Sequence, residues 1–154
     1  MLKAIESGSL DAMYILAQAY MNREVPCATP EDDVFVLSKR AAISGHTPSY
    51  ISLGNIYYDK ESKFFNPAEA FRWYEKIYDI LKNMRENDER HFVSSNGAGG
   101  VMFKEFTLAY RVKFYDVMIR LADMYHSGIG VEKNEIVAED VTDLAVELSH
   151  KLRP

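Results

Sequence analysis

The stretch LADMYHSGIGV, Leu121 to Val131, decides the fold of this chain because its opening pattern occurs twice more upstream. The pattern Leu-Ala-x-x-Tyr stands at Leu16 to Tyr20, and the variant Leu-Gly-x-x-Tyr stands at Leu53 to Tyr57. Leucine and tyrosine are one helical turn apart, and the small residue beside the leucine lets a second helix approach closely. The sequence therefore predicts a repeat protein built from helices.

Two further stretches end alike and give the repeat its period. Ala4 to Gly8 and Ala41 to Gly45 both look like the last turn of a helix followed by a stop glycine. The sequence separation of the two glycines, in the high thirties, is a repeat length typical of solenoids built from helix pairs.

Amphipathic spacing and capping residues divide the chain into helices. From Ser9 to about Asn22, apolar residues recur at i, i+3 and i+4, which indicates an amphipathic helix. Three later helices begin at a cap followed by proline: Thr29-Pro30, Thr47-Pro48 and Asn66-Pro67. Asn134 caps the last helix. In the helix from Pro30 to Ser44 we expect Val34, Leu37, Ala41 and either Val36 or Ile43 to be buried.

The period breaks after the second helix pair. The helix from Asn66 continues to about His91, a length of about 39 Å, and a glycine-rich turn separates it from an early start of the next helix. Leu121 and Tyr125 then follow Leu53 and Tyr57 by the same offset of 68 residues. We therefore predict one domain, residues 1–154, with repeats at about 9–45, 46–78 and 114–152, and a long helical hairpin inserted at 79–113.

Composition excludes several classes of function. The 154 residues are 47% hydrophobic and carry a net charge of -5, which is ordinary for a soluble globular domain and unlike proteins that bind nucleic acid. No stretch approaches the roughly 20 apolar residues that span a bilayer, and no signal peptide opens the chain. The single cysteine, Cys27, allows no intramolecular disulfide, so we expect a cytoplasmic protein.

The sequence also offers no pattern for catalysis, a metal or a cofactor. The four histidines are far apart, and none pairs with another ligand at helical spacing. The Gly97 to Gly100 loop lacks the lysine and hydroxyl residues of a phosphate-binding loop. We therefore expect no enzyme. The alternative is a small-ligand-binding protein or enzyme with a pocket at the base of the hairpin.

The repeated residues resemble Sel1-like repeats, which are related to the tetratricopeptide repeat. The residues that carry the resemblance are Ala12, Leu16, Ala17, Tyr20, Ala41, Ala42 and Gly45 in the first copy, Leu53, Gly54, Tyr57, Ala70 and Trp73 in the second, and Leu121, Ala122, Tyr125, Gly128, Gly130, Val131 and Ala138 in the third. The first two copies lack the Gly-x-Gly-Val turn, and the hairpin is foreign to the repeat. The resemblance implies an all-α solenoid of about three helix pairs that acts as a non-enzymatic scaffold or adaptor, often bacterial. In some relatives the role is that of an immunity protein that neutralises a cognate toxin.

The resemblance also implies where a partner protein would bind. In tetratricopeptide geometry, the first helix of each pair lines a concave wall, and residues flanking the packing motif face the partner. Those positions here are Asp11, Tyr14, Gln18, Met21, Asn22, Ile51, Asn55, Tyr58, Asp59, Asp116, Ile119, Asp123 and His126. They include acids and no lysine or arginine, so we expect a partner with a basic surface, such as a toxin or signalling protein, bound there or at the hairpin. The alternative is a solvated helix face.

Overall fold

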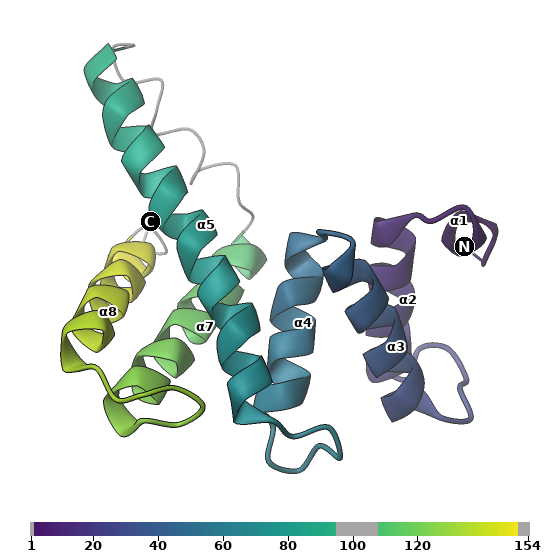
Figure 1. The fold of residues 1–154 in the computed structure, drawn as a ribbon. Helices are drawn as coiled ribbons and strands as arrows, with labels where there is room; N and C mark the ends of the chain where they lie inside the picture. The colour runs from purple at the N-terminus through teal and green to yellow at the C-terminus, as the bar shows by residue number, and fades with distance from the viewer. Residues whose placement is uncertain (1, 95–107, 151–154) are drawn as a thin grey trace. The chain divides into compact units, whose positions relative to one another are not determined.

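The computed structural model describes residues 2–94 and 108–150, and these residues form α-helices without a β-strand (Figure 1). The helices are α1 (Leu2–Glu6), α2 (Leu10–Met21), α3 (Pro30–Ile43), α4 (Thr47–Tyr58), α5 (Pro67–Ser94), α7 (Leu108–Ser127) and α8 (Glu135–His150). The predicted all-α class is confirmed.

The helices form two compact units, Met1–Asn66 and Pro67–Pro154, called here the N-terminal and C-terminal units. In the N-terminal unit α1 contacts α2, α2 packs on α3, and α3 packs on α4. In the C-terminal unit α7 packs on α8 and α5 contacts α7. Within each unit, helices that follow one another are packed together, as a chain of helix pairs requires. The repeat boundaries at 9–45, 46–78 and 114–152 stay a prediction.

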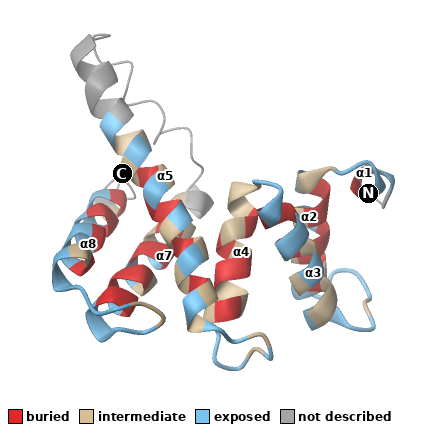
Figure 2. Cartoon of the chain, in the orientation of Figure 1, coloured by how far each residue is buried: buried red, intermediate tan, exposed pale blue. Residues whose placement is uncertain are grey.

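The repeated motif forms the core of both units (Figure 2). Tyr57 meets the Phe35 ring edge-on, with centroids 5.7 Å apart, and Tyr125 meets Phe71 in the same way at 5.2 Å. Such T-shaped pairs are a preferred geometry of aromatic rings. The leucines and their small neighbours are buried: Leu16, Ala17, Leu53, Gly54, Leu121 and Ala122. Tyr20 of the first copy is half-buried and packs against the core of the N-terminal unit. The predicted packing role of the motif is confirmed.

Backbone hydrogen bonds repeat at the predicted offset of 68 residues. The N–H of Asn66 donates to the carbonyl oxygen of Tyr57 over 2.8 Å, and the N–H of Asn134 donates to that of Tyr125 over 2.8 Å. Each bond closes the loop that follows a helix carrying the motif, α4 or α7. The two loops differ in sequence, yet both close on the carbonyl oxygen of the motif tyrosine.

The stop glycines adopt the conformation that the sequence predicts. Gly8 and Gly45 have φ of 88° and 95°, a region that favours glycine. The N–H of the next residue reaches back to Ala4 and to Ala41, over 2.8 and 3.0 Å, which is the usual closure of a helix C-terminus. After α2, Arg23 takes this position with φ of 59°, where Gly128 stands after α7. A non-glycine residue there costs roughly 1–2 kcal/mol.

The inner face of α3 differs from the expected one. Val34 and Ala41 are buried as predicted, and Leu37 is half-buried. Val36 and Ile43 are 58% and 67% exposed, so the expectation that one of them is buried was wrong. The two residues are seven apart and therefore share one helix face, which is turned away from the neighbouring helices. Ser38 and Ala42 are buried in their place.

The long helix after Asn66 is confirmed. Helix α5 runs without a break for 28 residues, about 42 Å. At the base of the expected hairpin, buried apolar side chains of α5 and α7 fill the core: Ile77, Leu81, Phe114 and Met118. The glycine-rich turn of the predicted hairpin falls in 95–107, outside the described residues. Among the described helices, none has the length and apolar character needed to traverse a bilayer.

Tyr125 should make the C-terminal unit sensitive to alkaline pH. Its hydroxyl donates to Glu75 Oε1 over 3.4 Å, and burial together with the Glu75 charge raises the Tyr125 pKa to about 12. The unfolded phenol ionises near pH 10, so folding loses stability as pH rises from about 10 to 12, by at most about 2–3 kcal/mol. Urea titrations at several pH values measure this loss. Tyr125→Phe should reduce its slope, and equal slopes in both proteins would contradict the assignment.

Candidate protein-binding surfaces

Of the thirteen residues predicted to face a partner, Ile51 does not reach the surface. Ile51 is only 4% exposed, so its predicted outward position was wrong. The buried residues of α4, which include Ser49, Leu53 and Gly54, occupy more than one side of the helix. A position beside the packing motif is therefore covered as well. The other members of the set on α2 and α4, or directly after them, are half-buried or exposed: Asp11, Tyr14, Gln18, Met21, Asn22, Asn55, Tyr58 and Asp59.

Several of these side chains already hold the N-terminal unit together. Gln18 Nε2 donates to Ser52 Oγ over 3.3 Å and so links α2 to α4. Asp11 Oδ1 lies 3.0 Å from His46 Nε2, and the Tyr14 ring packs 5.4 Å from the His46 ring. These contacts give the predicted residues a packing role, whatever partner they also meet.

The order Asp11, His46, Ser49 superficially resembles the triad of a serine hydrolase. His46 Nδ1 lies 2.7 Å from Ser49 Oγ, and its other ring nitrogen meets the carboxylate. However, Ser49 is 0% exposed, whereas the Asp11 side chain is 87% exposed. A nucleophile must be reachable by substrate, and the triad aspartate is normally the buried member. The hydrogen bonds among these three side chains instead link the first turn of α4 to α2.

On α7 the predicted residues do reach the surface. Asp116, Ile119, Asp123 and His126 are all exposed, and their spacing of three and four residues places them on one helix face. Ile119 keeps 41% of its surface exposed between two acids. The position of these residues agrees with the expectation, while their role in binding stays a prediction.

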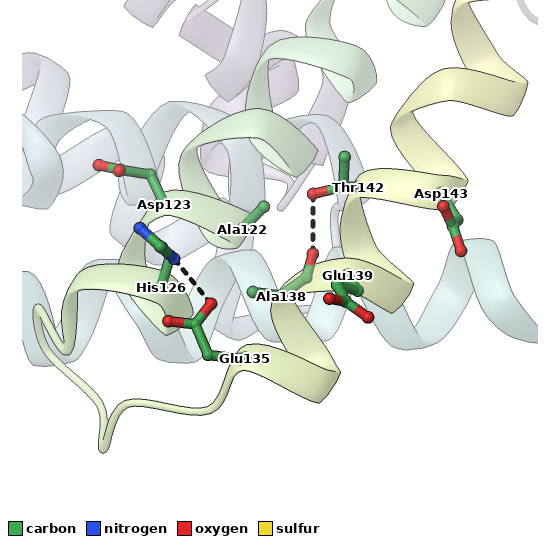
Figure 3. A pocket seen from close by; sticks show the side chains of 8 residues that line it. All are labelled: Ala122, Asp123, His126, Glu135, Ala138, Glu139, Thr142 and Asp143. Atoms are coloured by element: carbon green, nitrogen blue, oxygen red, sulfur yellow. Dashed lines mark hydrogen bonds and ion pairs between the residues drawn. The ribbon is translucent and has the colours of Figure 1, made fainter.

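A groove of about 400 Å³ lies beside this face, between α7 and α8, and is called here the α7/α8 groove (Figure 3). Ala122 and Ala138, small residues of the repeat motif, leave the hollow because neither side chain extends beyond Cβ. Its remaining lining residues are Asp123 and His126 from α7 and Glu135, Glu139, Thr142 and Asp143 from α8.

At one end of the groove, a carboxylate is neutralised. Glu135 Oε2 lies 2.7 Å from His126 Nδ1, and Glu135 Oε1 lies 3.1 Å from Lys133 Nζ. The hydrogen bond from His126, followed by that from Lys133, holds the Glu135 pKa below its ordinary value. The contact is therefore present at neutral pH and is lost as pH falls through that lowered pKa.

The rest of the groove carries uncompensated negative charge. Glu139 and Asp143 form no ion pair with any described lysine, arginine or histidine, and both are exposed. Asp123 accepts a hydrogen bond from Ser127 Oγ over 3.3 Å, which leaves its charge in place. Figure 3 shows Glu139 and Asp143 one turn apart along α8. The groove thus presents three anionic groups in the open.

Sequence reasoning found the α7 side of this groove and missed the α8 side. The signal was present, because Glu135, Glu139, Asp143 and Glu147 follow one another at every fourth residue and so share a helix face. Of these four acids, Glu147 pairs outside the groove with Arg85, whose Nη1 lies 3.4 Å from Glu147 Oε1.

Across residues 2–94 and 108–150, no three histidine, cysteine or acidic side chains come together in a way that could hold a metal ion.

Comparison with known proteins adds little to this geometry. No protein-family model matches the chain, and no curated protein matches it. Among solved structures, the chain is similar to a protective antigen present in uropathogenic Escherichia coli strains that displays an SLR fold, at 20% sequence identity and a TM-score of 0.45. SLR denotes the Sel1-like repeat, which the sequence motifs resemble. The match covers 94% of this chain but 39% of that protein, so this chain spans about two fifths of its length.

Proposed function

We propose that this chain is a non-enzymatic scaffold that binds a partner protein, and that the α7/α8 groove takes a basic segment of that partner. The observation that carries the proposal is a groove lined by three acids that form no ion pair with a described lysine, arginine or histidine: Asp123 on α7 and Glu139 and Asp143 on α8. Opposite charges on two surfaces steer the partners together and set their orientation.

Two features of the groove suit a protein segment. Ile119 gives an apolar contact next to the acids, and its neighbours Asp116 and Asp123 extend the negative charge along α7. A partner helix or strand with lysine or arginine beside an apolar residue would match both.

Charge reversal in the groove and on the exposed α7 face beside it should weaken capture of the partner. The variants are Asp116→Lys with Asp123→Lys on α7, and Glu139→Lys with Asp143→Lys on α8. All four substituted residues are exposed, so both variants should remain folded, which circular dichroism checks. We expect each to lower affinity at least about tenfold, because two attractive contacts become repulsive.

The matched control is Glu132→Lys with Asp140→Lys, which changes the charge equally outside the groove lining. Affinity capture from the source cell followed by mass spectrometry identifies proteins retained by the control and lost by the groove variants. Calorimetry then measures the affinity of such a protein. A partner bound equally by all variants would place binding elsewhere.

A narrower form of the proposal makes the partner a toxin that this chain neutralises, as the resemblance to Sel1-like proteins implies. Coexpression of the chain with the product of the adjacent gene tests this form. Restored growth by the wild type but not by the groove variants would support it, and continued toxicity with the wild type would contradict it.

A further inference from the structure

A second surface cleft, of about 560 Å³, lies in the N-terminal unit where α2 ends, α3 begins and the loop after α4 starts. It is called here the α2–α4 cleft. Its apolar lining includes Met21, Val34 and Ile56, from three different helices. Val34 is buried at the bottom, while Met21 remains 51% exposed. Clefts of this volume with an apolar floor commonly hold a ligand or a partner side chain.

Three carboxylates border this floor: Glu31, Asp59 and Glu61. None of them forms an ion pair with a described lysine, arginine or histidine. Two are held in place by backbone donors, because Glu31 Oε1 accepts from the Lys63 N–H over 3.1 Å and Asp59 Oδ1 accepts from the Glu61 N–H over 2.9 Å. A fixed carboxylate loses little freedom when it meets a cation, which favours binding.

Arg23 lines the same cleft and supplies its one positive charge among the described lining residues. It forms no ion pair with the three acids. It occupies the left-handed position at which glycine stands after α7. The net charge of the lining is nevertheless negative.

From the apolar floor and the surplus of fixed carboxylates we propose that the α2–α4 cleft binds a segment of a partner protein through an apolar side chain adjacent to a lysine or arginine. The apolar side chain covers Met21, Val34 and Ile56, and the basic group meets Glu31, Asp59 and Glu61. This site is separate from the α7/α8 groove and extends the proposed function to a second surface.

A displayed library of random peptides about twelve residues long, selected on the full chain, tests the proposal. We expect enriched peptides to carry an apolar residue next to a basic one. The cleft variant Glu31→Gln, Asp59→Asn, Glu61→Gln keeps the hydrogen-bond acceptors and removes three charges. Affinity of the enriched peptides should fall about tenfold in it, as expected for three surface charge contacts.

Three further proteins make the result specific. Glu6→Gln, Glu132→Gln, Asp140→Asn removes three charges elsewhere and should change affinity less than about twofold, as should the groove variant Glu139→Lys with Asp143→Lys. Insensitivity to the groove variant separates this cleft from the first proposal. Arg23→Gln removes a like charge and should tighten binding. Peptides without a basic residue, unchanged binding by the cleft variant, or lost binding in Arg23→Gln would each overturn the proposal.

Discussion

Gly130→Ala is expected to destabilise the C-terminal unit by about 3–5 kcal/mol, among the larger effects of a single substitution. Gly130 has φ of 74°, which a residue with a Cβ rarely adopts. A Cβ there would also lie 2.4 Å from the Pro67 carbonyl oxygen and 2.6 Å from its carbonyl carbon. These are backbone atoms at the first residue of α5, so they cannot rotate away as a side chain can. Urea unfolding followed by circular dichroism measures the loss.

Gly128→Ala is the matched control for Gly130→Ala. Gly128 has a similar φ of 70°, but a Cβ there meets its nearest atom, Lys133 Cβ, at 3.5 Å. It should therefore cost only the conformational term, roughly 1–2 kcal/mol. The difference between the two variants isolates the clash with Pro67. Equal losses would mean that the turn relaxes away from α5 at little cost.

Leu121→Ala is expected to cost about 2–5 kcal/mol, because the motif leucine is 0% exposed and its removal leaves a cavity. The single tryptophan, Trp73, lies on α5 in the same unit, so its fluorescence reports unfolding there. The midpoint of urea unfolding should fall while the slope stays the same.

Ile136→Ala is the control for Leu121→Ala, since Ile136 is 75% exposed in the same unit. It should change stability by less than about 0.5 kcal/mol. A small loss at Leu121, similar to that at Ile136, would show that the repeated leucine does not hold the core.

The helices could be predicted because their signals are local. Asn134 accepts from the N–H of Val137 over 3.2 Å, which is the cap that its position suggested. Gly8 and Gly45 end their helices as expected, since a left-handed residue after a helix favours glycine wherever it occurs. These features depend on a few neighbouring residues. The expected cap at Thr47 was wrong, because His46 is the N-cap of α4 and Thr47 is the first residue of the helix.

The candidate sites could be predicted only in part. The α7 face was predicted because its residues follow the packing motif at helical spacing. The acids of α8 line the groove only because α8 packs beside α7, which the sequence alone does not reveal. The α2–α4 cleft joins Arg23, Glu31 and Asp59 from three segments, and no spacing in the sequence links them.

The sequence by itself determined the helical class, the helix ends and the leucines and tyrosines of the core, because these follow from periodicity and capping within one or two turns. Only the tertiary structure decided which positions beside the motif are exposed to solvent. Tyr14, Ile51 and Ile119 hold the same place in the motif, yet they are half-buried, buried and exposed. A flanking side chain faces whatever packs alongside its helix, and that neighbour comes from distant sequence.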